Sequence, residues 1–435
     1  MLALACGKSE PPGAGPAASA SAATTIRDAA ALLAVKAEPH PSGPPRDLNV
    51  LLISVDCLRA DMPWAGYDRP IAPVLTALEK RSISYTHAYS LSSYTSMSLG
   101  GLLGGRYPGE MKRDGNFFGK YRDNVLFPER LQKAGIRTLT AHAHLYFQKG
   151  AAGFDRAFDS YELVPKLKWN STTDENVTSP DLEKIAERLL TDPTNTAGRF
   201  FAWFHFLDPH DQYQRHPGIE LHGHKARDLY DGEVTFTDGY IGKLLDFVDK
   251  QPWGARTAVV VTADHGEVFG EHGQWRHAFE LWEPLVRVPL MLYLPGAQPQ
   301  HIDVPRSHID LAPTILDLMG ISPSDMEGQS LVSEIYGQSV AEPRDIVIDL
   351  PRTSDSDRRR AIIHDHFKLI AFGDDVRYQV FDIEADPEEA NSIQKTDRAK
   401  FDEMVALYKA KEKQIKDVGP YACRTLKGAP VGRAF

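Results

Sequence analysis

The sequence predicts an α/β protein with a large, mainly parallel or mixed sheet sandwiched by helices, and a small carboxyl-terminal antiparallel sheet with one helix. Two observations lead to this fold class. Apolar runs such as residues 49–55 and 257–262 alternate with stretches of helical spacing, which is the pattern of strands that are covered on both faces. After about residue 341, short strand-like runs follow one another in quick succession, which favours antiparallel pairing.

Each expected element has its own local signal. In the first part of the chain, apolar and β-branched runs predict strands at 49–55, 83–89, 136–141, 199–205, 257–262 and 288–294. Helical spacing predicts helices at 72–81, 95–103, 127–134, 230–250 and 309–319, several of which end at a glycine. Beyond these, we expect strands at 345–350, 360–363, 368–372 and 378–382, and a helix at 399–416.

Composition limits the classes of function. The chain has 435 residues, of which 42% are hydrophobic and 25% are charged, so a soluble globular enzyme fits better than a fibrous or disordered protein. The net charge is −10, and no patch dense in Lys and Arg is evident, so nucleic acid is not expected as a partner. No apolar run approaches the ~20 residues that a membrane-spanning helix needs.

The amino-terminal segment resembles the end of a bacterial lipoprotein signal. Small residues precede Cys6, and residues 8–46 are rich in Ala, Pro, Ser and Gly, as in a flexible tether. We therefore expect a location in the bacterial cell envelope, with membrane contact only through a lipid anchor on Cys6. The expected division is a signal remnant and tether over 1–46, a catalytic domain over 47–340 and a small α+β subdomain over 341–435. Three cysteines are too few for a disulfide framework.

Acidic and histidine side chains follow the predicted strands at the points where these strands end. Asp56 follows one strand, Asp264 and His265 follow another, and His210 lies just after a third. In open α/β sheets, ligands bind at the carboxyl ends of the strands. Carboxylates with an imidazole suit a divalent cation. An Asp-His pair alone is more often a capped turn beside a packed histidine.

A hydroxyl-rich segment lies between the first two of these strand ends. It reads Ser-Ser-Tyr-Thr-Ser-Met-Ser over residues 92–98 and begins a predicted helix, with Thr95 near the helix amino terminus. The free N–H groups and the helix dipole favour an anion there. A cation held by Asp56, Asp264 and His265 would lower the pKa of the hydroxyl and make it a nucleophile. Ser96 and Ser98 are competing candidates, and the alternative for Thr95 is a helix cap.

Taken together, these motifs resemble the sulfatase family of the alkaline phosphatase superfamily. The stretch Asn-Val-Leu-Leu-Ile-Ser-Val-Asp ending at Asp56 is similar to the first metal strand of the family. Further similarities, in the same order along the chain, are found at 102–108, 154–161, 208–210, 264–289, 368–370 and 381–387. The resemblance covers roughly residues 47–416, and several of these motifs are specific when they occur together.

The resemblance implies roles for particular residues. Asp56, Asp264 and His265 correspond to metal ligands, and Thr95 takes the position of the nucleophile, where it would also contact the metal. His210 corresponds to a histidine that contacts the transferred anionic group. His272 and His277 match a histidine followed five positions later by a basic residue, so His277 is expected to protonate the leaving oxygen. The implied cofactor is one divalent metal, which is Ca²⁺, Mn²⁺ or Mg²⁺, with Zn²⁺ as a further candidate.

Several residues depart from the family pattern. Sulfatases carry a Cys or Ser that is oxidised to formylglycine, whereas this chain has Thr95, and Met97 and Leu99 replace the family's Pro and Arg. Cys57 replaces the second acid that often follows the first metal ligand; it is either a softer ligand or packed core. Two histidines, at 142 and 144, fall near the positions of residues that hold the substrate anion in the family.

The expected function is a metal-dependent hydrolase of sulfate or of phosphate and phosphonate esters, with a Thr nucleophile in place of formylglycine. The substrate would be a small-molecule, glycan or lipid ester. A transferase that passes the group to a lipid or glycan hydroxyl is the first alternative. A catalytically decayed binding protein is the second, favoured by Met97 and Leu99 but opposed by the intact Asp264–Glu267 block. The sequence does not predict the oligomeric state.

Overall fold

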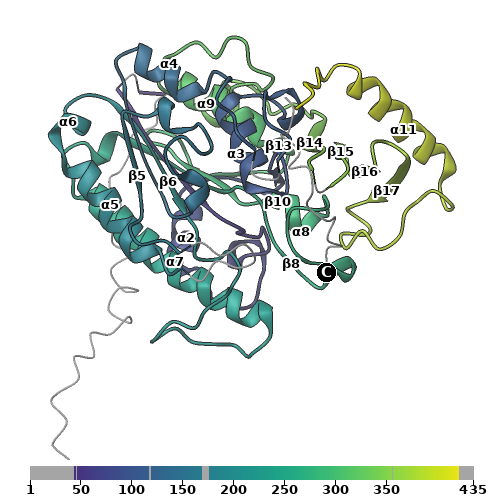
Figure 1. Ribbon diagram of the computed structural model, residues 1–435, viewed down its shortest axis with the longest axis horizontal. Helices are drawn as coiled ribbons and strands as arrows, with labels where there is room; N and C mark the ends of the chain where they lie inside the picture. Colours follow the sequence, from purple (N-terminus) through teal and green to yellow (C-terminus); the bar gives the residue numbers. More distant parts are fainter. Residues whose placement is uncertain (1–43, 46, 117–118, 169–175, 355, 421–435) are drawn as a thin grey trace, which may run out of the picture.

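The computed structural model describes residues 44–45, 47–116, 119–168, 176–354 and 356–420. Its centre is an eight-stranded sheet in the order β12-β2-β11-β7-β1-β6-β4-β5 (Figure 1). In that order the strands are β12 (Gln300–Ile302), β2 (Ile83–Tyr85), β11 (Leu290–Tyr293), β7 (Thr257–Ala263), β1 (Asn49–Val55), β6 (Phe200–Phe206), β4 (Arg137–His142) and β5 (Ser160–Leu163).

The middle of this sheet is parallel. Strand β1 pairs in parallel with both β6 and β7, and β4 continues the parallel run to β5, whereas β11 runs antiparallel to β7 and β2. In register, Val55 lies beside Phe206 on one side and Ala263 on the other. The residues that follow β1 and β7 therefore emerge next to each other at one edge of the sheet. The predicted mixed sheet is confirmed.

Helices cover both faces of the large sheet, as Figure 1 shows. One face carries α2 (Pro73–Glu79), α5 (Ser179–Thr191) and α7 (Ala226–Asp249), and the other carries α3 (Thr95–Gly104), α4 (Phe127–Lys133) and α9 (Leu311–Leu318). Side chains of β1 alternate between the two cores. Val50 and Leu52 pack with the α3, α4 and α9 layer, whereas Leu51 and Ile53 pack with the α2, α5 and α7 layer. This explains why the strand is apolar throughout.

Smaller elements complete the fold. A three-stranded sheet contains β10 (Arg287–Val288), β3 (Ala88–Tyr89) and β13 (Arg306–Ser307), and a two-stranded ribbon contains β8 (Val268–Phe269) and β9 (Trp275–Arg276). The short helices are α6 (Pro193–Thr196), α8 (Glu283–Val286) and α10 (Val332–Ile335). The carboxyl-terminal sheet is antiparallel, in the order β14 (Ile346–Leu350), β15 (Arg359–His364), β16 (Phe367–Phe372) and β17 (Arg377–Asp382), and α11 (Arg398–Glu412) packs on it.

A buried ion cluster ties this small sheet to the main body. Lys368 on β16 is fully buried, and its Nζ lies 2.9 Å from Glu283 Oε1 and 2.9 Å from Glu389 Oε1. Glu283 is the first residue of α8, and its backbone N–H donates to Glu389 Oε2. Burial raises the pKa of Glu389 to about 7, with a further contribution from the Glu283 charge, although the Lys368 ammonium works in the other direction.

Most predicted elements are present, with informative exceptions. The run predicted as one strand over 83–89 is divided, because β2 joins the large sheet while β3 joins the three-stranded sheet. The run over 288–294 is divided at Pro289, which has no N–H to donate to a sheet ladder. Helix α5 and strand β5 were not predicted. The long helix α7 begins at Ala226, four residues before the predicted start, where Asp228 accepts a hydrogen bond from the Lys225 N–H.

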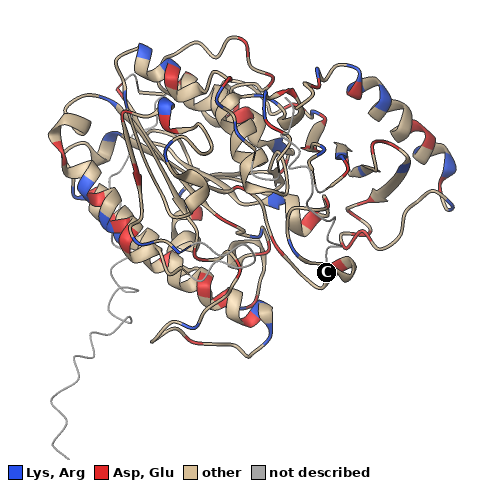
Figure 2. Ribbon diagram, viewed as in Figure 1, with Lys and Arg blue, Asp and Glu red and all other residues tan. Residues whose placement is uncertain are grey.

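Some predictions fall outside what the structure describes. Cys6, Cys423 and nearly all of the predicted tether over 1–46 lie outside the described residues, and the domain boundaries stay predictions. Within the described ranges, no helix combines the length and apolar character that crossing a membrane requires. Figure 2 shows Lys and Arg interspersed with Asp and Glu along α5, α7 and α11.

Candidate metal centre

Two neighbouring strand ends deliver two buried carboxylates. Asp56 follows β1 and Asp264 follows β7, and both side chains are almost completely excluded from solvent. The backbone N–H of Asp56 donates to the carbonyl of Phe206 at 2.8 Å, which extends the pairing of β1 with β6 to the site itself. The parallel register of β1 and β7 thus sets the two acids beside each other, as the sequence predicted.

His265 presents one unprotonated ring nitrogen to this pair. Its Nδ1 donates to the Gly266 carbonyl at 2.9 Å, so in the neutral ring Nε2 carries the lone pair. Nε2 lies 3.4 Å from Asp264 Oδ2 and 3.7 Å from Asp56 Oδ1. Burial lowers the pKa of His265, which favours this neutral form. The arrangement is the one that a metal-binding histidine adopts.

Thr95 is the hydroxyl residue that reaches the cluster. It is the first residue of α3 and half-buried, and its Oγ1 lies 3.0 Å from His265 Nε2. The two competing serines, Ser96 and Ser98, make hydrogen bonds to other groups. The Ser98 hydroxyl donates to the backbone carbonyl of Asp264 at 2.6 Å, and the Ser96 side chain is hydrogen-bonded to Tyr121. Ser98 therefore fixes α3 to the end of β7, which places Thr95 beside the acids.

The electrostatics of the pair fit a cation. Burial opposes the charged form of Asp56, but the hydrogen bond with His205 and the nearby charges of other histidines hold its pKa well below the usual value. Burial and the Asp56 charge raise the pKa of Asp264. Asp264 Oδ2 is buried and finds no hydrogen-bond partner among the described residues. Asp56, Asp264 and His265 offer ligand atoms within 4.8 Å of one another, so these donors suit a divalent metal.

His205, within β6, was not singled out in the sequence, yet it contacts Asp56. Its Nε2 lies 3.2 Å from Asp56 Oδ2, and its Nδ1 lies 2.8 Å from Ser54 Oγ. Trp203 Nε1 donates to the same Ser54 Oγ at 2.8 Å. Because an ionised carboxylate only accepts, His205 Nε2 is the donor to Asp56 Oδ2, and Asp56 Oδ1 faces the cluster. A polar residue in an otherwise apolar strand was the available signal.

His277 and His210 lie at the open side of the cluster. The His277 ring is 4.3 Å from the His265 ring and 5.0 Å from the His210 ring, between centroids. His277 Nδ1 lies 3.3 Å from Glu267 Oε1 and 3.5 Å from Cys57 Sγ. Although burial works in the other direction, the Glu267 carboxylate raises the pKa of His277. The structure therefore places both predicted histidines beside the cluster.

Glu267 is a second residue that the sequence reasoning missed as part of the site. It is fully buried, and its Oε2 accepts a hydrogen bond from the Tyr213 hydroxyl at 2.9 Å. Arg59 Nη1 donates to its backbone carbonyl at 2.7 Å. These bonds hold the carboxylate against His277. Its position three residues after Asp264, in the same short motif, was the signal.

The structure does not bring the remaining predicted histidines to the acids. His272 is exposed, and its ring stacks on Trp282 at 3.8 Å between centroids. His142 is buried, stacks on Phe147 and bonds to the Thr140 hydroxyl at 2.9 Å through Nε2. His144 Nδ1 accepts from the Tyr146 N–H. A catalytic role for His272 stays a prediction that this geometry does not favour.

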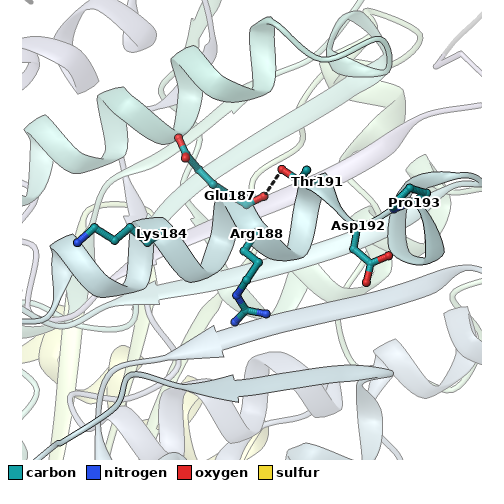
Figure 3. A pocket seen from close by; sticks show the side chains of 6 residues that line it. All are labelled: Lys184, Glu187, Arg188, Thr191, Asp192 and Pro193. Carbon is teal, nitrogen blue, oxygen red and sulfur yellow. Dashed lines mark hydrogen bonds between the residues drawn. The ribbon is translucent and has the colours of Figure 1, made fainter.

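An open hollow lies elsewhere on the surface, over α5. Figure 3 shows it lined by Lys184, Glu187, Arg188, Thr191, Asp192 and Pro193. The Thr191 hydroxyl donates to the Glu187 carbonyl at 2.7 Å, within the last turn of α5. None of the strand-end acids or histidines lines this hollow, and we assign it no part in the chemistry.

Comparison with solved structures identifies the fold. A protein solved in complex with D-glucosamine-2-N,6-O-disulfate aligns with a TM-score of 0.68 and 19% identity, covering 86% of this chain and 99% of that chain. A phosphonate monoester hydrolase from Silicibacter pomeroyi aligns with a TM-score of 0.66 and 20% identity, covering 85% of this chain and 96% of the other. At these identities the likeness establishes the fold alone.

Comparison with sequences establishes the family. The chain is 30% identical to the choline-sulfatase of Rhizobium meliloti over 207 residues, 45% of this chain and 40% of the relative. It is 34% identical to the N-acetylglucosamine-6-O-sulfatase of Bacteroides thetaiotaomicron over 206 residues, 44% of this chain and 36% of the relative. The chain thus spans less than half the length of these curated relatives. The model of the N-sulphoglucosamine sulphohydrolase carboxyl-terminal region matches residues 270–417, and the sulfatase model matches residues 48–321. The chain therefore belongs to the sulfatase family.

Proposed function

We propose that the chain is a metal-dependent hydrolase of sulfate or phosphate and phosphonate esters in which Thr95 serves as the nucleophile. The observation that carries the proposal is the position of Thr95 Oγ1, 3.0 Å from the free Nε2 of His265. That nitrogen also faces Asp56 and Asp264, so the hydroxyl borders the group of atoms that suits a cation. Family membership supports hydrolytic chemistry at this site.

Asp56, Asp264, His265 and Thr95 would hold the cation. When bound, it lowers the pKa of the Thr95 hydroxyl and offsets the negative charge that develops on the transferred group. Thr95 loses its proton to solvent, and Oγ1 attacks the sulfur or phosphorus atom in line with the ester oxygen that leaves. The amino terminus of α3, where Thr95 lies, favours the anionic group through its dipole.

His277 supplies the proton for the leaving oxygen. Its Nδ1 faces Glu267, so Nε2 is the nitrogen that remains to face the substrate. Although burial works in the other direction, the Glu267 carboxylate raises the pKa of His277, which favours the protonated ring that a general acid requires. His210, beside His277, contacts the oxygens of the transferred group. In the second step, water gives a proton to the neutral His277 and attacks the sulfur or phosphorus atom. The bond from that atom to Thr95 Oγ1 breaks, Oγ1 takes back a proton from solvent, and sulfate, phosphate or phosphonate is released.

The threonine changes the second half of the reaction. A formylglycine hydrate expels sulfate by collapsing to the aldehyde, whereas a threonyl ester has to be cleared by water. This difference favours phosphodiester or phosphonate chemistry. The phosphonate monoester hydrolase among the fold neighbours is consistent with that choice, and the two curated relatives, by their names, point to sulfate esters of small molecules and sugars. The proposal includes the cell envelope as the location, through Cys6.

A substrate panel tests the proposal. Purified protein is depleted of metal with a chelator, reloaded separately with Ca²⁺, Mg²⁺, Mn²⁺ or Zn²⁺, and assayed with an aryl sulfate, choline sulfate, N-acetylglucosamine 6-sulfate, an aryl phosphodiester and an aryl phosphonate. We expect turnover of at least one ester that is lost on chelation and in Thr95→Ala. Full activity of Thr95→Ala would contradict the assigned nucleophile. Cation binding without turnover would favour a binding protein, and transfer to an added alcohol in preference to water would favour a transferase.

A further inference from the structure

The side chain of Cys57 points into the cluster of acids and histidines. Cys57 follows Asp56 directly, is fully buried and has φ 60°, a left-handed conformation that is uncommon for a residue with a side chain. The Tyr230 hydroxyl donates to the Cys57 carbonyl at 2.9 Å and accepts from the Arg59 N–H at 2.9 Å. These two bonds hold the backbone in this conformation, which turns the thiol toward the strand ends.

The sulfur faces polar groups. Cys57 Sγ lies 3.1 Å from Asp56 Oδ1 and 3.5 Å from His277 Nδ1. Its sulfur and ligand atoms of His265 and His277 lie within 4.8 Å of one another, and the same holds for Cys57 with Asp56 and His210. Within the described part of the chain, Cys57 belongs to none of the hydrophobic clusters. The hydrogen-bond contacts of this buried thiol are to a carboxylate and an imidazole.

A second observation points to a ligand at the same place. Asp264 Oδ2 is completely buried, and no hydrogen bond to it is found among the described residues. It lies 3.4 Å from His265 Nε2, and Asp56 Oδ1, the acceptor of the thiol, lies 3.7 Å from that same nitrogen. A buried carboxylate oxygen without a partner costs free energy that a cation would recover.

We propose that Cys57 joins Asp56, Asp264, His265 and Thr95 as a ligand and binds the cation as a thiolate, so that the site takes Zn²⁺ or a similar transition metal in preference to Ca²⁺ or Mg²⁺. The inference rests on the cation of the proposed function and specifies its class. On binding, the thiol proton leaves to solvent and a sulfur lone pair forms the bond to the metal, with no change of oxidation state. His277 Nδ1 is in position to donate to the bound sulfur.

The donor set and spacing favour this class of metal. Ca²⁺ takes 6–8 oxygen ligands, roughly, whereas sulfur and imidazole nitrogen are preferred by Zn²⁺ and its neighbours. Ligand atoms at the distances of about 2.0–2.3 Å that zinc takes lie about 3–4 Å from one another. The separations are 3.1 Å between Cys57 Sγ and Asp56 Oδ1, 3.4 Å between Asp264 Oδ2 and His265 Nε2, and 3.7 Å between Asp56 Oδ1 and that nitrogen.

Cobalt spectroscopy tests the inference independently of activity. The metal-free full chain is titrated with Co²⁺ while the near-ultraviolet charge-transfer band of thiolate-bound cobalt is recorded. The comparison uses the natural chain, Cys57→Ser, and a Cys6→Ser/Cys423→Ser control in which Cys57 is the only remaining thiol. We expect the band in the natural chain and in the control but not in Cys57→Ser. Equilibrium dialysis against mixed Zn²⁺ and Ca²⁺ should show a preference for Zn²⁺ that falls at least ~10-fold in Cys57→Ser.

The outcomes separate this inference from the proposed function. Co²⁺ bound at one equivalent without the band would overturn the thiolate ligand while leaving a metal-dependent hydrolase intact. An unchanged ratio of Zn²⁺ to Ca²⁺ in Cys57→Ser would overturn it as well. No binding of any divalent cation would contradict both. If Cys57→Ser does not fold, the spectrum of the natural chain and of the control decides the question.

Discussion

Replacing Lys368 by Met should strongly destabilise the protein, because it leaves two buried carboxylates without their cation. Lys368 Nζ lies 2.9 Å from both Glu283 Oε1 and Glu389 Oε1 and is fully buried. At an effective dielectric constant of about 20, each pair at this distance is worth about 6 kcal/mol before desolvation. The desolvation of the ammonium offsets much of this energy, so we expect a net loss of about 3–5 kcal/mol in the free energy of unfolding.

The pH dependence of this loss has a defined sign. The folded-state pKa of Glu389 is raised by burial from 4.5 to about 7. A carboxyl group with a raised pKa contributes stability that is present below pH 4.5 and is lost as the pH rises through about 7. Without Lys368 the ionised form is opposed more strongly, so Lys368→Met should be more destabilising at pH 8 than at pH 6.

Equilibrium urea unfolding, followed by circular dichroism and tryptophan fluorescence at both pH values, measures the effect. Lys184→Met, which removes an exposed lysine on α5 (72% exposed side chain), is the matched control and should change stability by no more than about 0.5 kcal/mol. Adding Glu283→Gln and Glu389→Gln to Lys368→Met should restore most of the stability. A loss below about 1 kcal/mol at pH 8, or no recovery in the triple variant, would refute the reasoning.

Three further predictions concern the site. Thr95→Ala should lower kcat by on the order of 10³-fold or more while the protein still binds metal. Thr95→Ser should keep measurable turnover, because it retains a hydroxyl. Equal activity of the two variants would count against a nucleophilic hydroxyl. Glu267→Gln exchanges a charged partner of His277 for a neutral one, so kcat/KM should fall about 10-fold. Because the carboxylate raises the pKa of His277, the alkaline limb of the pH profile of kcat/KM should move to lower pH in this variant. An alkaline limb that does not move would argue against His277 as the general acid. His205→Gln should weaken cation binding about 10–100-fold, measured by titration calorimetry, since its hydrogen bond orients Asp56; unchanged affinity would show that this bond is unimportant.

The sequence predicted the parts of the site that local patterns determine. Asp56 and Asp264 end apolar strands, and parallel pairing is enough to bring their side chains together at one edge. Thr95 begins a helix whose small residues let it pack against the end of β7, where Ser98 bonds to the Asp264 carbonyl. These predictions used strand ends, a helix start and the rule that sites form at the carboxyl edge of a parallel sheet, and the resemblance to the sulfatase family selected Thr95 among the hydroxyl residues.

Residues that act through long-range contacts were harder to predict. His205 lies within a strand, and only the register of β1 with β6 places its ring between Ser54 and Asp56. Glu267 contacts His277, ten residues later in the chain, because the antiparallel pairing of β8 with β9 brings the two residues together. His272 was predicted as a site residue from the resemblance to the family pattern, and in the structure its ring stacks on Trp282.

The central claim is that Asp56, Asp264 and His265 hold one divalent cation beside the Thr95 hydroxyl. Metal analysis after equilibrium dialysis tests it most directly, with the natural chain compared with Asp264→Asn and with Asp317→Asn, a substitution on helix α9 of a carboxylate that accepts from the Ser330 hydroxyl. We predict one equivalent of metal in the natural chain and in Asp317→Asn, and a loss of most of it in Asp264→Asn. Full metal content in Asp264→Asn, or none in the natural chain with any of the four cations, would contradict the account.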